Sequence, residues 1–536
     1  MKLTRRDALK IGGLAAVGTA GLTLPFGRSV SAGTPSLLSS ANMPKPYAAA
    51  FARLEVLTPR IGSDANGPIH YYDIAARSSS VGILPNLKTP VLGYDGLVPA
   101  KRIDVEQGTR IKMTMRNKLP PVHPAFGTPL AISTHLHGSA SLPQYDGYAS
   151  DVTLPEQKKY YSYPNGQKAR TLWYHDHGVH YTAQNAYSGL ASQYHLHDPV
   201  ERALLPQGEF DVALTVSDMM FNADGSQQYD DRSHSGLWGD VILVNGRPWP
   251  LMRVKKRIYR FRFLNASLSR SYRPSLSNGA PVYMVATDGG LMPKTQAVTQ
   301  WRHGSAERYE FLVDFRSYKA GTRIELKNLS NPNNRDYDNT GKIMAFDVVD
   351  DAFDRSDATW SAIPTLLDPG NEVMAQVPTS STKVRNIRVQ RNDTTNEWNL
   401  NGESWHDVVD SDYKKVLANP DLGDTEIWEI ENKSGGWFHP VHIHLIDFKI
   451  LDRNGKPPFS YELGPKDVVY VGEGEKVRVV MKFGPHRGKY MVHCHNLPHE
   501  DHDMMHQFSV GLKDTDIDDN DPIKADPAVD DSDDDH

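Results

Sequence analysis

The sequence predicts an all-β protein of about three consecutive domains, and three observations support this. The chain has 536 residues and a mass of 59.8 kDa, which suits three domains at roughly 150 residues each. Its 41 glycines and 36 prolines suit many short strands joined by turns. Apolar residues alternate with polar ones in several segments, whereas no long amphipathic helical pattern is present.

The alternating segments occur in each third of the chain. Residues 110–116 place Ile111, Met113 and Met115 on one face, and residues 259–263 set aromatic side chains against arginines. Residues 477–483 alternate in the same way. A period of two is typical of half-buried strands, so we expect antiparallel sheets with one face packed on a core.

The strand-rich segments divide the chain into domains near residues 45–200, 205–352 and 385–512. A stretch that contains proline, aspartate and serine separates the second domain from the third, and we interpret residues 353–384 as a linker. The histidine clusters described below fall in the first and third domains only.

The N-terminus resembles an export signal. Thr4-Arg5-Arg6-Asp7 resembles a twin-arginine motif, and the mildly apolar stretch 11–24 has 14 residues, fewer than the roughly 20 that a membrane helix needs. Cleavage after Ala32 would make residues 1–32 a signal peptide. The alternatives are an uncleaved anchor or a chance pair of arginines. We expect export by the twin-arginine machinery to the periplasm or outside of a bacterial cell, without a stable membrane anchor.

The charge of the chain is concentrated at its ends. The formal net charge is −6, but residues 1–32 carry five basic groups and one acidic group, and the segment from Asp514 carries eleven aspartates and one lysine. The central part is therefore close to neutral, which does not suggest a nucleic-acid partner. We interpret residues 513–536 as an acidic disordered tail, with weak divalent-cation binding as the alternative.

The only cysteine, Cys494, lies between His493 and His495. A buried structural cysteine is the ordinary interpretation of a lone thiol. Here, however, residues 493–505 also offer imidazole and thioether groups. A thiolate, two histidines and a weak axial methionine form the ligand set of a blue-copper site.

Three further segments contain histidines two residues apart. Side chains at positions i and i+2 of a strand point to the same face, roughly 7 Å apart, so each pair can bind metal together. Four pairs give eight imidazoles, enough to enclose three copper ions, and Cys494 would point to the opposite face from its neighbours. A single pair is weak evidence, whereas four are unlikely by chance. The four pairs are His135/His137, His175/His177, His442/His444 and His493/His495, with His439 nearby.

These motifs resemble those of the three-domain multicopper oxidases, which include laccases, bilirubin oxidases and spore-coat oxidases. Segments 435–449, 493–505 and 171–177 carry a narrower resemblance to the bilirubin oxidase branch. The resemblance implies three cupredoxin-like Greek-key β-sandwich domains, with a copper cluster between the first and last domains and no ligands in the middle one. It also implies four copper ions per chain.

The resemblance assigns a role to each ligand position. Met504 is the implied axial ligand of the type 1 copper, and its neighbour Met505 lies one residue off the family pattern. The implied type 1 ligands are His439, Cys494, His499 and Met504; the type 2 ligands are His135 and His442; the type 3 ligands are His137, His175, His177, His444, His493 and His495.

Two acidic residues match family positions near the copper cluster. Reduction of O2 to water consumes protons, so Asp146 and Glu500 are implied proton donors; orientation of the ligating histidines is the alternative. Trp437 lies two residues before His439, the ligand that the resemblance expects to face solvent. We predict that Trp437 and His439 form the organic-substrate site, with packing as the alternative for the tryptophan.

Two other polar features are expected to be structural. Asp176 should point away from His175 and His177, and the pair His195/His197 lies where the first domain should end.

The resemblance implies a function. Small reducing substrates (phenols, aromatic amines or tetrapyrroles such as bilirubin) would be oxidised one electron at a time, and four electrons would reduce O2 to water. The alternative is a metallo-oxidase that acts on Mn(II), Cu(I) or Fe(II). We expect a monomer.

Overall fold

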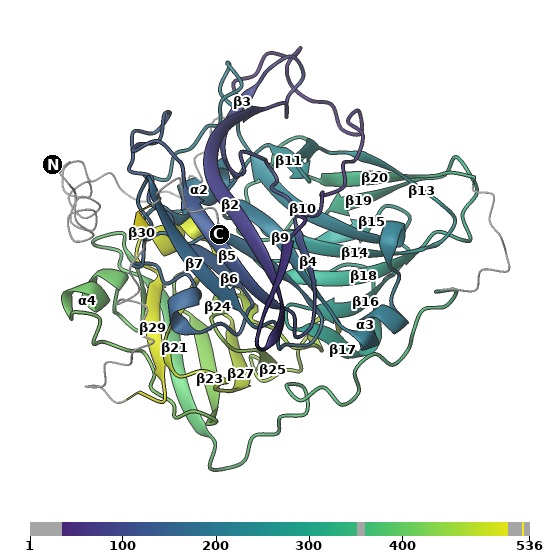
Figure 1. The fold of residues 1–536 in the computed structure, drawn as a ribbon. Helices are drawn as coiled ribbons and strands as arrows, with labels where there is room; N and C mark the ends of the chain where they lie inside the picture. Colours follow the sequence, from purple (N-terminus) through teal and green to yellow (C-terminus); the bar gives the residue numbers. More distant parts are fainter. Residues whose placement is uncertain (1–34, 351–359, 513–527, 530–536) are drawn as a thin grey trace.

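The computed structural model describes residues 35–350, 360–512 and 528–529. The predicted signal peptide and most of the predicted acidic tail lie outside these ranges. Figure 1 shows three groups of strands that follow one another along the chain, from purple and blue through teal to green and yellow. Each group contains two sheets.

The first group contains a six-stranded and a four-stranded sheet. The larger sheet comprises β1 (Arg60–Asp64), β2 (Gly67–Val81), β3 (Thr89–Tyr94), β5 (Arg110–Asn117), β7 (Gln157–Tyr163) and β30 (Ala528–Val529). The smaller sheet comprises β4 (Ile103–Glu106), β6 (Thr134–His137), β8 (Arg170–Asp176) and β9 (Ala191–His197). Apolar side chains from both sheets form one buried cluster.

The second group is the largest and carries no predicted copper ligand. Its seven-stranded sheet comprises β10 (Asp211–Met219), β11 (Val241–Val244), β12 (Arg247–Pro248), β14 (Ile258–Asn265), β16 (Val282–Thr287), β17 (Gly290–Val298) and β18 (Arg308–Asp314). Its four-stranded sheet comprises β13 (Leu251–Val254), β15 (Pro274–Leu276), β19 (Arg323–Asn328) and β20 (Lys342–Val348).

The third group again pairs two sheets. One comprises β21 (Lys383–Arg391), β22 (Trp398–Leu400), β23 (Thr425–Asn432), β25 (Phe448–Arg453) and β27 (Lys476–Lys482). The other comprises β24 (His439–Ile443), β26 (Val468–Val471), β28 (Gly488–Cys494) and β29 (Met505–Val510). In the part of the chain that the structure describes, four short α-helices lie in connections between strands. α2 (Thr182–Ser188) and α3 (Pro199–Leu204) flank β9, and α4 (Trp405–Asp410) and α5 (Leu497–Asp501) lie in the third group.

The expectation of purely antiparallel sheets is wrong. Each pair of sheets contains at least one parallel pair of strands: β2 with β5, β4 with β9, β10 with β14, β13 with β20, and β21 with β23. Parallel neighbours require a connection that leaves the sheet and returns to it. Alternation along a single strand carries no information about the direction of its neighbour, so the sequence pattern could not distinguish the two arrangements.

The predicted alternation is confirmed in β5 and β27 and corrected in β14. Ile111, Met113 and Met115 are buried while Lys112 between them is exposed. In β14, by contrast, Arg260 and Arg262 are as buried as the aromatic residues between them. The arginine face packs against the first group of strands, where Arg262 contacts Thr171 and His197. Glu201 of α3 and Asp211 of β10 neutralise the arginines.

The predicted linker and the predicted acidic tail each contact a strand of another part of the chain. Residues 360–382 form no strand, and part of this stretch runs beside β17, where Leu367 donates a backbone hydrogen bond to Pro293. β30, within the predicted acidic tail, pairs antiparallel with the start of β7.

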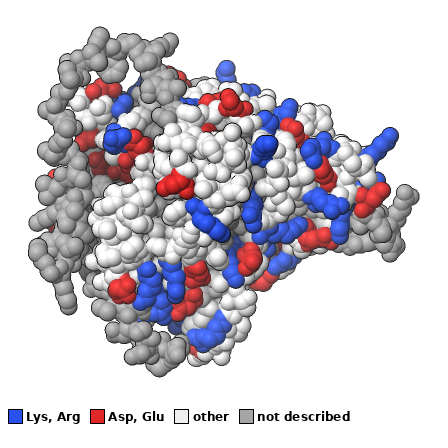
Figure 2. All heavy atoms as spheres, turned by 90° about the horizontal axis from the view of Figure 1, so that it is seen from above, with Lys and Arg blue, Asp and Glu red and all other residues white. Residues whose placement is uncertain are grey.

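The surface carries charges of both signs. On the face that Figure 2 shows, Lys and Arg side chains are interspersed with Asp and Glu. Within residues 35–350, 360–512 and 528–529, no helix combines the length and the apolar character that crossing a membrane would require.

Candidate metal centre

The predicted histidine pairs lie on strands whose register brings them together. In the first group of strands, His135 of β6 lies opposite His175 of β8. In the third group, His442 of β24 lies opposite His493 of β28, and Val441 lies opposite Cys494. Cross-strand partners share a face of the sheet. His442 and His493 therefore point to one side and Cys494 to the other, as the alternation predicts.

The cysteine side holds a compact group of three donors. His439 Nδ1 lies 3.3 Å from Cys494 Sγ, His499 Nδ1 lies 3.8 Å from it, and the two Nδ1 atoms are 3.3 Å apart. All three residues are fully buried. This triangle places one thiolate and two imidazoles around a space of the size that one metal ion requires.

The two candidate methionines point to different sides of β29. Met504 packs in the same apolar cluster as Cys494, and its carbonyl oxygen accepts a hydrogen bond from the Cys494 backbone N–H at 3.0 Å. Met505 lies opposite His493 and packs instead with Tyr148 and Trp405. Of the two, Met504 is the methionine on the cysteine side.

The remaining eight histidines form three overlapping groups between the first and third groups of strands. In each group the nearest donor atoms lie within 4.8 Å of one another. Every group combines histidines from both ends of the chain, so the site exists only when the two regions pack together. The groups are His135/His137/His442, His137/His175/His495 and His177/His444/His493.

Hydrogen bonds to the rear of these rings fix which nitrogen faces inward. His135 Nδ1 and His442 Nδ1 donate to the carbonyl oxygens of Asp146 and Asp467, at 2.5 and 2.8 Å. His175 Nδ1 donates to the Asp176 carbonyl oxygen at 2.7 Å. A ring that donates from Nδ1 keeps a lone pair on Nε2, which leaves that nitrogen available to a metal ion.

The inward nitrogens fit a metal cluster because they have no other partner. Among the described residues, the buried atoms without a hydrogen-bond partner include His135 Nε2, His137 Nδ1, His175 Nε2, His442 Nε2 and both ring nitrogens of His495. A buried polar atom without a partner costs roughly 1–3 kcal/mol. Cations bound in these groups would satisfy one nitrogen of each ring.

The histidine group His177/His444/His493 also indicates a bound metal ion. His493 Nε2 lies 3.2 Å from both His177 Nε2 and His444 Nε2. His444 Nδ1 donates to Asp146 Oδ2 at 2.7 Å, and His493 Nδ1 lies 2.8 Å from Glu500 Oε2. The protons therefore sit on the outer nitrogens, and the inner lone pairs face one another. A cation between them relieves this repulsion.

Burial keeps the donors in the protonation states that metal binding requires. It lowers the pKa of His135, His442, His444 and His495 well below the usual range, so these rings are neutral ligands. Burial also raises the pKa of the Cys494 thiol. Because metal ions bind the thiolate, metal binding at Cys494 must displace a proton.

The two predicted acids both contact ligand histidines from behind. Asp146 and Glu500 are fully buried. Burial alone raises the pKa of Glu500, but His493 and His177 lower it to about 2; for Asp146 burial raises the pKa well above its usual range. The hydrogen bond between Asp146 and His444 and the ion-pair contact between Glu500 and His493 are typical of residues that orient histidines, and both acids lie directly beside the cluster.

The sequence did not indicate Asp467, Arg308 or Trp173. Asp467 Oδ1 lies 3.3 Å from His137 Nε2 and 2.6 Å from Arg308 Nη1, which comes from the middle group of strands. Trp173 stacks on His175 with 4.0 Å between ring centroids. Asp467 and Arg308 belong to no recognisable motif, whereas Trp173 lies in segment 171–177, two residues before a predicted ligand.

The expectation that His439 faces solvent is wrong. Its ring is fully buried, and Ser434 Oγ lies 2.7 Å from its Nε2. Trp437, in the same segment, is half-buried; its ring contacts that of His499 edge-on at 5.6 Å and stacks with Trp238 at 6.5 Å. A donor would therefore meet tryptophan before histidine.

The structural expectation for Asp176 agrees with its contacts. For the His195/His197 pair it stays a prediction, because their donor atoms and that of Asp104 lie within 4.8 Å of one another and His195 Nδ1 has no hydrogen-bond partner among the described residues. Asp176 accepts hydrogen bonds from the backbone N–H groups of Ser133 and Gly178. His195 and His197 are buried; His195 Nε2 lies 2.7 Å from Gln193 Oε1.

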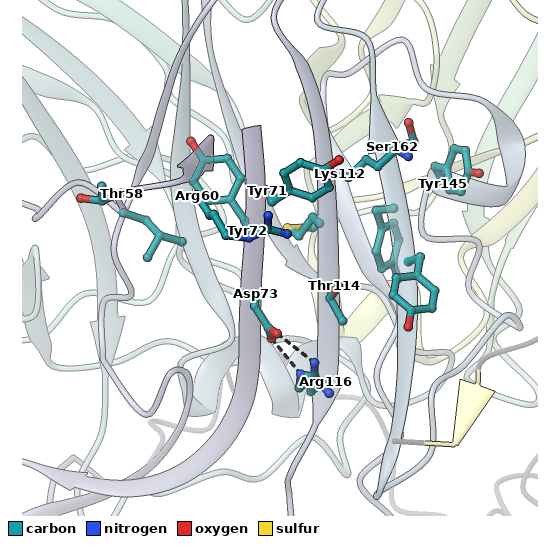
Figure 3. Close-up of a pocket in the computed structure, with 14 residues that line it drawn as sticks. Thr58, Arg60, Tyr71, Tyr72, Asp73, Lys112, Thr114, Arg116, Tyr145 and Ser162 are labelled. Atoms are coloured by element: carbon teal, nitrogen blue, oxygen red, sulfur yellow. Dashed lines mark hydrogen bonds and ion pairs between the residues drawn. The ribbon is translucent and has the colours of Figure 1, made fainter. Parts of the chain in front are cut away.

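A separate cavity of about 790 Å³ lies on the outer sheet of the first group of strands. Figure 3 shows its lining, in which the labelled tyrosines Tyr71, Tyr72 and Tyr145 lie above the Asp73–Arg116 ion pair. None of the lining residues is a predicted copper ligand, so this cavity is not the metal centre.

Comparisons with known proteins agree with the arrangement of the site. Family models described as multicopper oxidase match residues 76–201 and 376–514, the two regions that carry the histidines. The chain is 39% identical to a bilirubin oxidase from Albifimbria verrucaria over 85% of this chain and 79% of that protein. It is 32% identical to a laccase from Bacillus subtilis over 82% of this chain and 94% of that protein.

Solved structures give the same fold. The multicopper oxidase McoA from Aquifex aeolicus superposes with a TM-score of 0.73 at 29% identity, over 86% of this chain and all of the other. The three pairs of sheets are thus three consecutive cupredoxin-like β-sandwich domains, as the resemblance implied. The chain belongs to the multicopper oxidase family and is a copper-dependent oxidoreductase that uses O2 as its electron acceptor.

Proposed function

We propose that the chain oxidises phenols, aromatic amines or tetrapyrroles of the bilirubin type by single-electron steps, and that four such steps reduce one O2 to two waters. The observation that carries the proposal is the junction at 493–495, where one cysteine and its two neighbours point to opposite faces of β28. The likeness to a bilirubin oxidase and a laccase supports the donor class.

The proposed copper complement is four ions per chain. His439, Cys494 and His499, with Met504 as the axial residue, would hold the type 1 ion. His135 and His442 would hold the type 2 ion. Copper in these sites supplies the one-electron redox chemistry and the binding of O2. The type 3 pair would be held by His137, His175 and His495 on one side and by His177, His444 and His493 on the other.

The protein itself contributes geometry, a path for electrons and a supply of protons. The backbone of residues 493–495 joins the cysteine to both flanking histidines through a few covalent bonds. Asp146 accepts a hydrogen bond from His444, and Glu500 Oε2 lies 2.8 Å from His493 Nδ1. We assign proton delivery to these two acids, because both are buried carboxyl groups in contact with ligand rings of the proposed type 3 pair.

Substrate contact is assigned to the Trp437 surface. His439 is covered by the segment that contains Ser434 and Trp437, so the donor would deliver its electron through these residues rather than by touching the ring. Electron transfer of this kind needs little shape complementarity, which suits a broad donor range.

Export and assembly belong to the proposal as well. The twin-arginine motif at Arg5-Arg6 supports export of a folded chain to the periplasm or the cell exterior, and we propose a monomer without a membrane anchor.

The test is O2 uptake by the copper-loaded protein with bilirubin, a simple phenol, Mn(II) and Fe(II) as separate donors. Turnover with the organic donors is expected, with four donor electrons consumed per O2. Turnover with the metal ions alone would contradict the assigned donor class.

A further inference from the structure

Asp467 lies where the three domains meet. It directly precedes β26, which pairs with β24 so that His442 lies opposite Val468. The Asp467 carbonyl oxygen accepts a hydrogen bond from His442 Nδ1 at 2.8 Å, and its Oδ1 lies 3.3 Å from His137 Nε2. One aspartate therefore contacts a predicted ligand of the first domain and a predicted ligand of the third.

Both contacts determine which ring nitrogen points inward. Because a carboxylate only accepts, His137 donates from Nε2 and keeps its lone pair on Nδ1, which has no partner among the described residues. His442 has the reverse arrangement, with an unpartnered Nε2. The two rings stack on each other, with 3.6 Å between centroids and 13° between planes. A displaced Asp467 would therefore turn both rings together.

An arginine of the middle domain fixes the position of Asp467. Arg308 begins β18, and both residues are fully buried. Arg308 Nη1 lies 2.6 Å from Asp467 Oδ1, and Nη2 lies 2.5 Å from Oδ2. This two-pronged geometry is the strongest contact between a guanidinium and a carboxylate, and it holds the plane of the carboxylate as well as its position.

The same guanidinium also reaches the first domain. Arg308 Nε donates to the carbonyl oxygen of Thr171 at 2.9 Å, and Thr171 lies on β8, the strand that carries His175. Nη2 donates in addition to the carbonyl oxygen of Asp288, in the middle domain itself, at 3.2 Å. One side chain thus hydrogen-bonds groups of all three domains.

The ion pair packs directly against the backbone that follows His137. Gly138 has a φ of +86°, and a Cβ atom at this position would lie 2.6 Å from Arg308 Nη2 and 2.7 Å from Asp467 Oδ2. Only a glycine allows so close an approach. The end of β6 and the ion pair are therefore in direct contact and cannot shift independently.

We propose that Arg308 is a positioning residue for the copper cluster. It holds Asp467, and Asp467 fixes the rings of His137 and His442. The middle domain supplies no predicted ligand, but through this arginine it sets the geometry of the proposed type 2 and type 3 sites. The inference rests on the copper complement proposed above. The proposed type 2 ion has fewer protein ligands than either type 3 ion, so a turned ring should affect it most.

The experiment compares copper-loaded wild type with Arg308→Met, Arg308→Lys, Asp467→Asn and the double variant Arg308→Met/Asp467→Asn. The measurements are copper content per folded chain, the electron paramagnetic resonance (EPR) signal of the type 2 ion, bleaching of the blue colour by a simple phenol without O2, and reoxidation of the chemically reduced enzyme by O2. Arg270→Met is the matched control, because Arg270 is equally buried and pairs with Asp218 and Asp336 of its own domain.

We expect Arg308→Met to lose or alter the type 2 EPR signal and to slow reoxidation by about thirtyfold, while bleaching stays within about twofold of wild type because the type 1 ligands are untouched. Arg308→Lys keeps the charge but not the two-pronged contact, so reoxidation should slow by about threefold to tenfold. Asp467→Asn should resemble Arg308→Met. The double variant should be within about twofold of the slower single variant, because the two residues act in series.

Two further outcomes bear on the arginine itself. Arg270→Met should destabilise the protein without changing the type 2 EPR signal or reoxidation of the folded enzyme. An equal loss in Arg270→Met, or losses that multiply in the double variant, would overturn the inference. So would a wild-type EPR signal and wild-type reoxidation in both Arg308→Lys and Asp467→Asn, even if Arg308→Met does not fold.

The same data separate this inference from the proposed function. Reoxidation after chemical reduction does not depend on the class of organic donor. Unaltered variants beside a wild type that holds four copper ions and reoxidises normally would overturn the inference alone. A wild type without a type 2 EPR signal would overturn the proposed copper complement, and the inference with it.

Discussion

The histidine clusters between the first and third domains differ from the buried charges of the middle domain in how their polar atoms are satisfied. Arg260 and Arg262 are fully buried, and each contacts at least two carboxylates. Lys466 of the third domain, equally buried, lies 2.9 Å from both Asp288 and Glu307 of the middle domain. Within the described residues, no side-chain nitrogen of these three cations lacks a hydrogen-bond partner.

The histidine clusters show the opposite pattern. Nitrogens such as His135 Nε2 and His442 Nε2 are just as buried but have no partner in the described chain. Buried polar groups in folded proteins are nearly always paired, so a set of unpaired ones that face a common space indicates a missing ligand. The burial of polar groups by itself therefore says little about function. Whether the buried polar atoms have hydrogen-bond or ion-pair partners distinguishes a structural network from a metal centre.

The sharpest way to break this comparison is to remove one unpaired nitrogen. His442→Gln should lower O2 reduction at least about a thousandfold, a loss of roughly 4 kcal/mol of transition-state stabilisation, because one cluster ligand is gone. The free energy of unfolding of the metal-free protein should change by only about 1 kcal/mol. Copper content, O2 uptake and denaturation of the copper-free protein measure the two effects; a large loss of metal-free stability would contradict the comparison.

The converse experiment removes a paired charge. Arg260→Met leaves the buried Glu201 and Glu310 with only Arg262 as their cation, so the free energy of unfolding should fall by about 3–5 kcal/mol while copper content per folded chain is unchanged. Guanidinium denaturation of the copper-free protein measures the loss. Arg316→Met, which breaks a partly exposed pair with Asp314, is the control and should cost less than about 1 kcal/mol.

Glu500→Gln tests a residue that combines the two patterns. Its carboxylate is paired with a histidine, like the buried charges, but that histidine is a predicted copper ligand. We expect four copper ions to be retained and O2 reduction to slow by on the order of a hundredfold, since the amide cannot deliver a proton. Reoxidation of the reduced enzyme by O2 is the measurement. Loss of copper instead of rate would show that Glu500 only orients His493.

The smallest effect is expected at the surface. Trp437→Ala should raise KM for bilirubin by about threefold to tenfold and leave turnover at saturating donor within about twofold, because the copper ligands beneath it are untouched. Trp437→Phe should behave almost as wild type. A loss of turnover with unchanged KM would instead assign Trp437 to the electron path.

The structure brings the predicted donor side chains together, and the sequence could indicate them because part of the information is local. The spacing of two in His493-Cys494-His495 is sufficient to place the thiol and the imidazoles on opposite faces of a strand, and β28 has this arrangement. Alternation in β5 likewise identified the buried residues Ile111 and Met113.

What the sequence could not predict depends on contacts between distant segments. Arg308 and Asp467 are 159 positions apart and meet only after the second and third domains pack. The burial of His439 depends on Ser434 and Trp437 folding over it, and the alternation in β14 gave no sign that its arginines would be covered by another domain. The parallel strand pairs were missed for the same reason.

The central claim is that Cys494 joins electron entry to the histidine cluster, and Cys494→Ser tests it most directly. Copper quantification and visible absorption of wild type and variant, measured on the same preparations as O2 uptake, provide the comparison. The structure predicts four copper ions and an intense blue colour in wild type, and three copper ions, no blue colour and almost no oxidase activity in the variant. A Cys494→Ser protein that stays blue and oxidises its donors at the wild-type rate would contradict it.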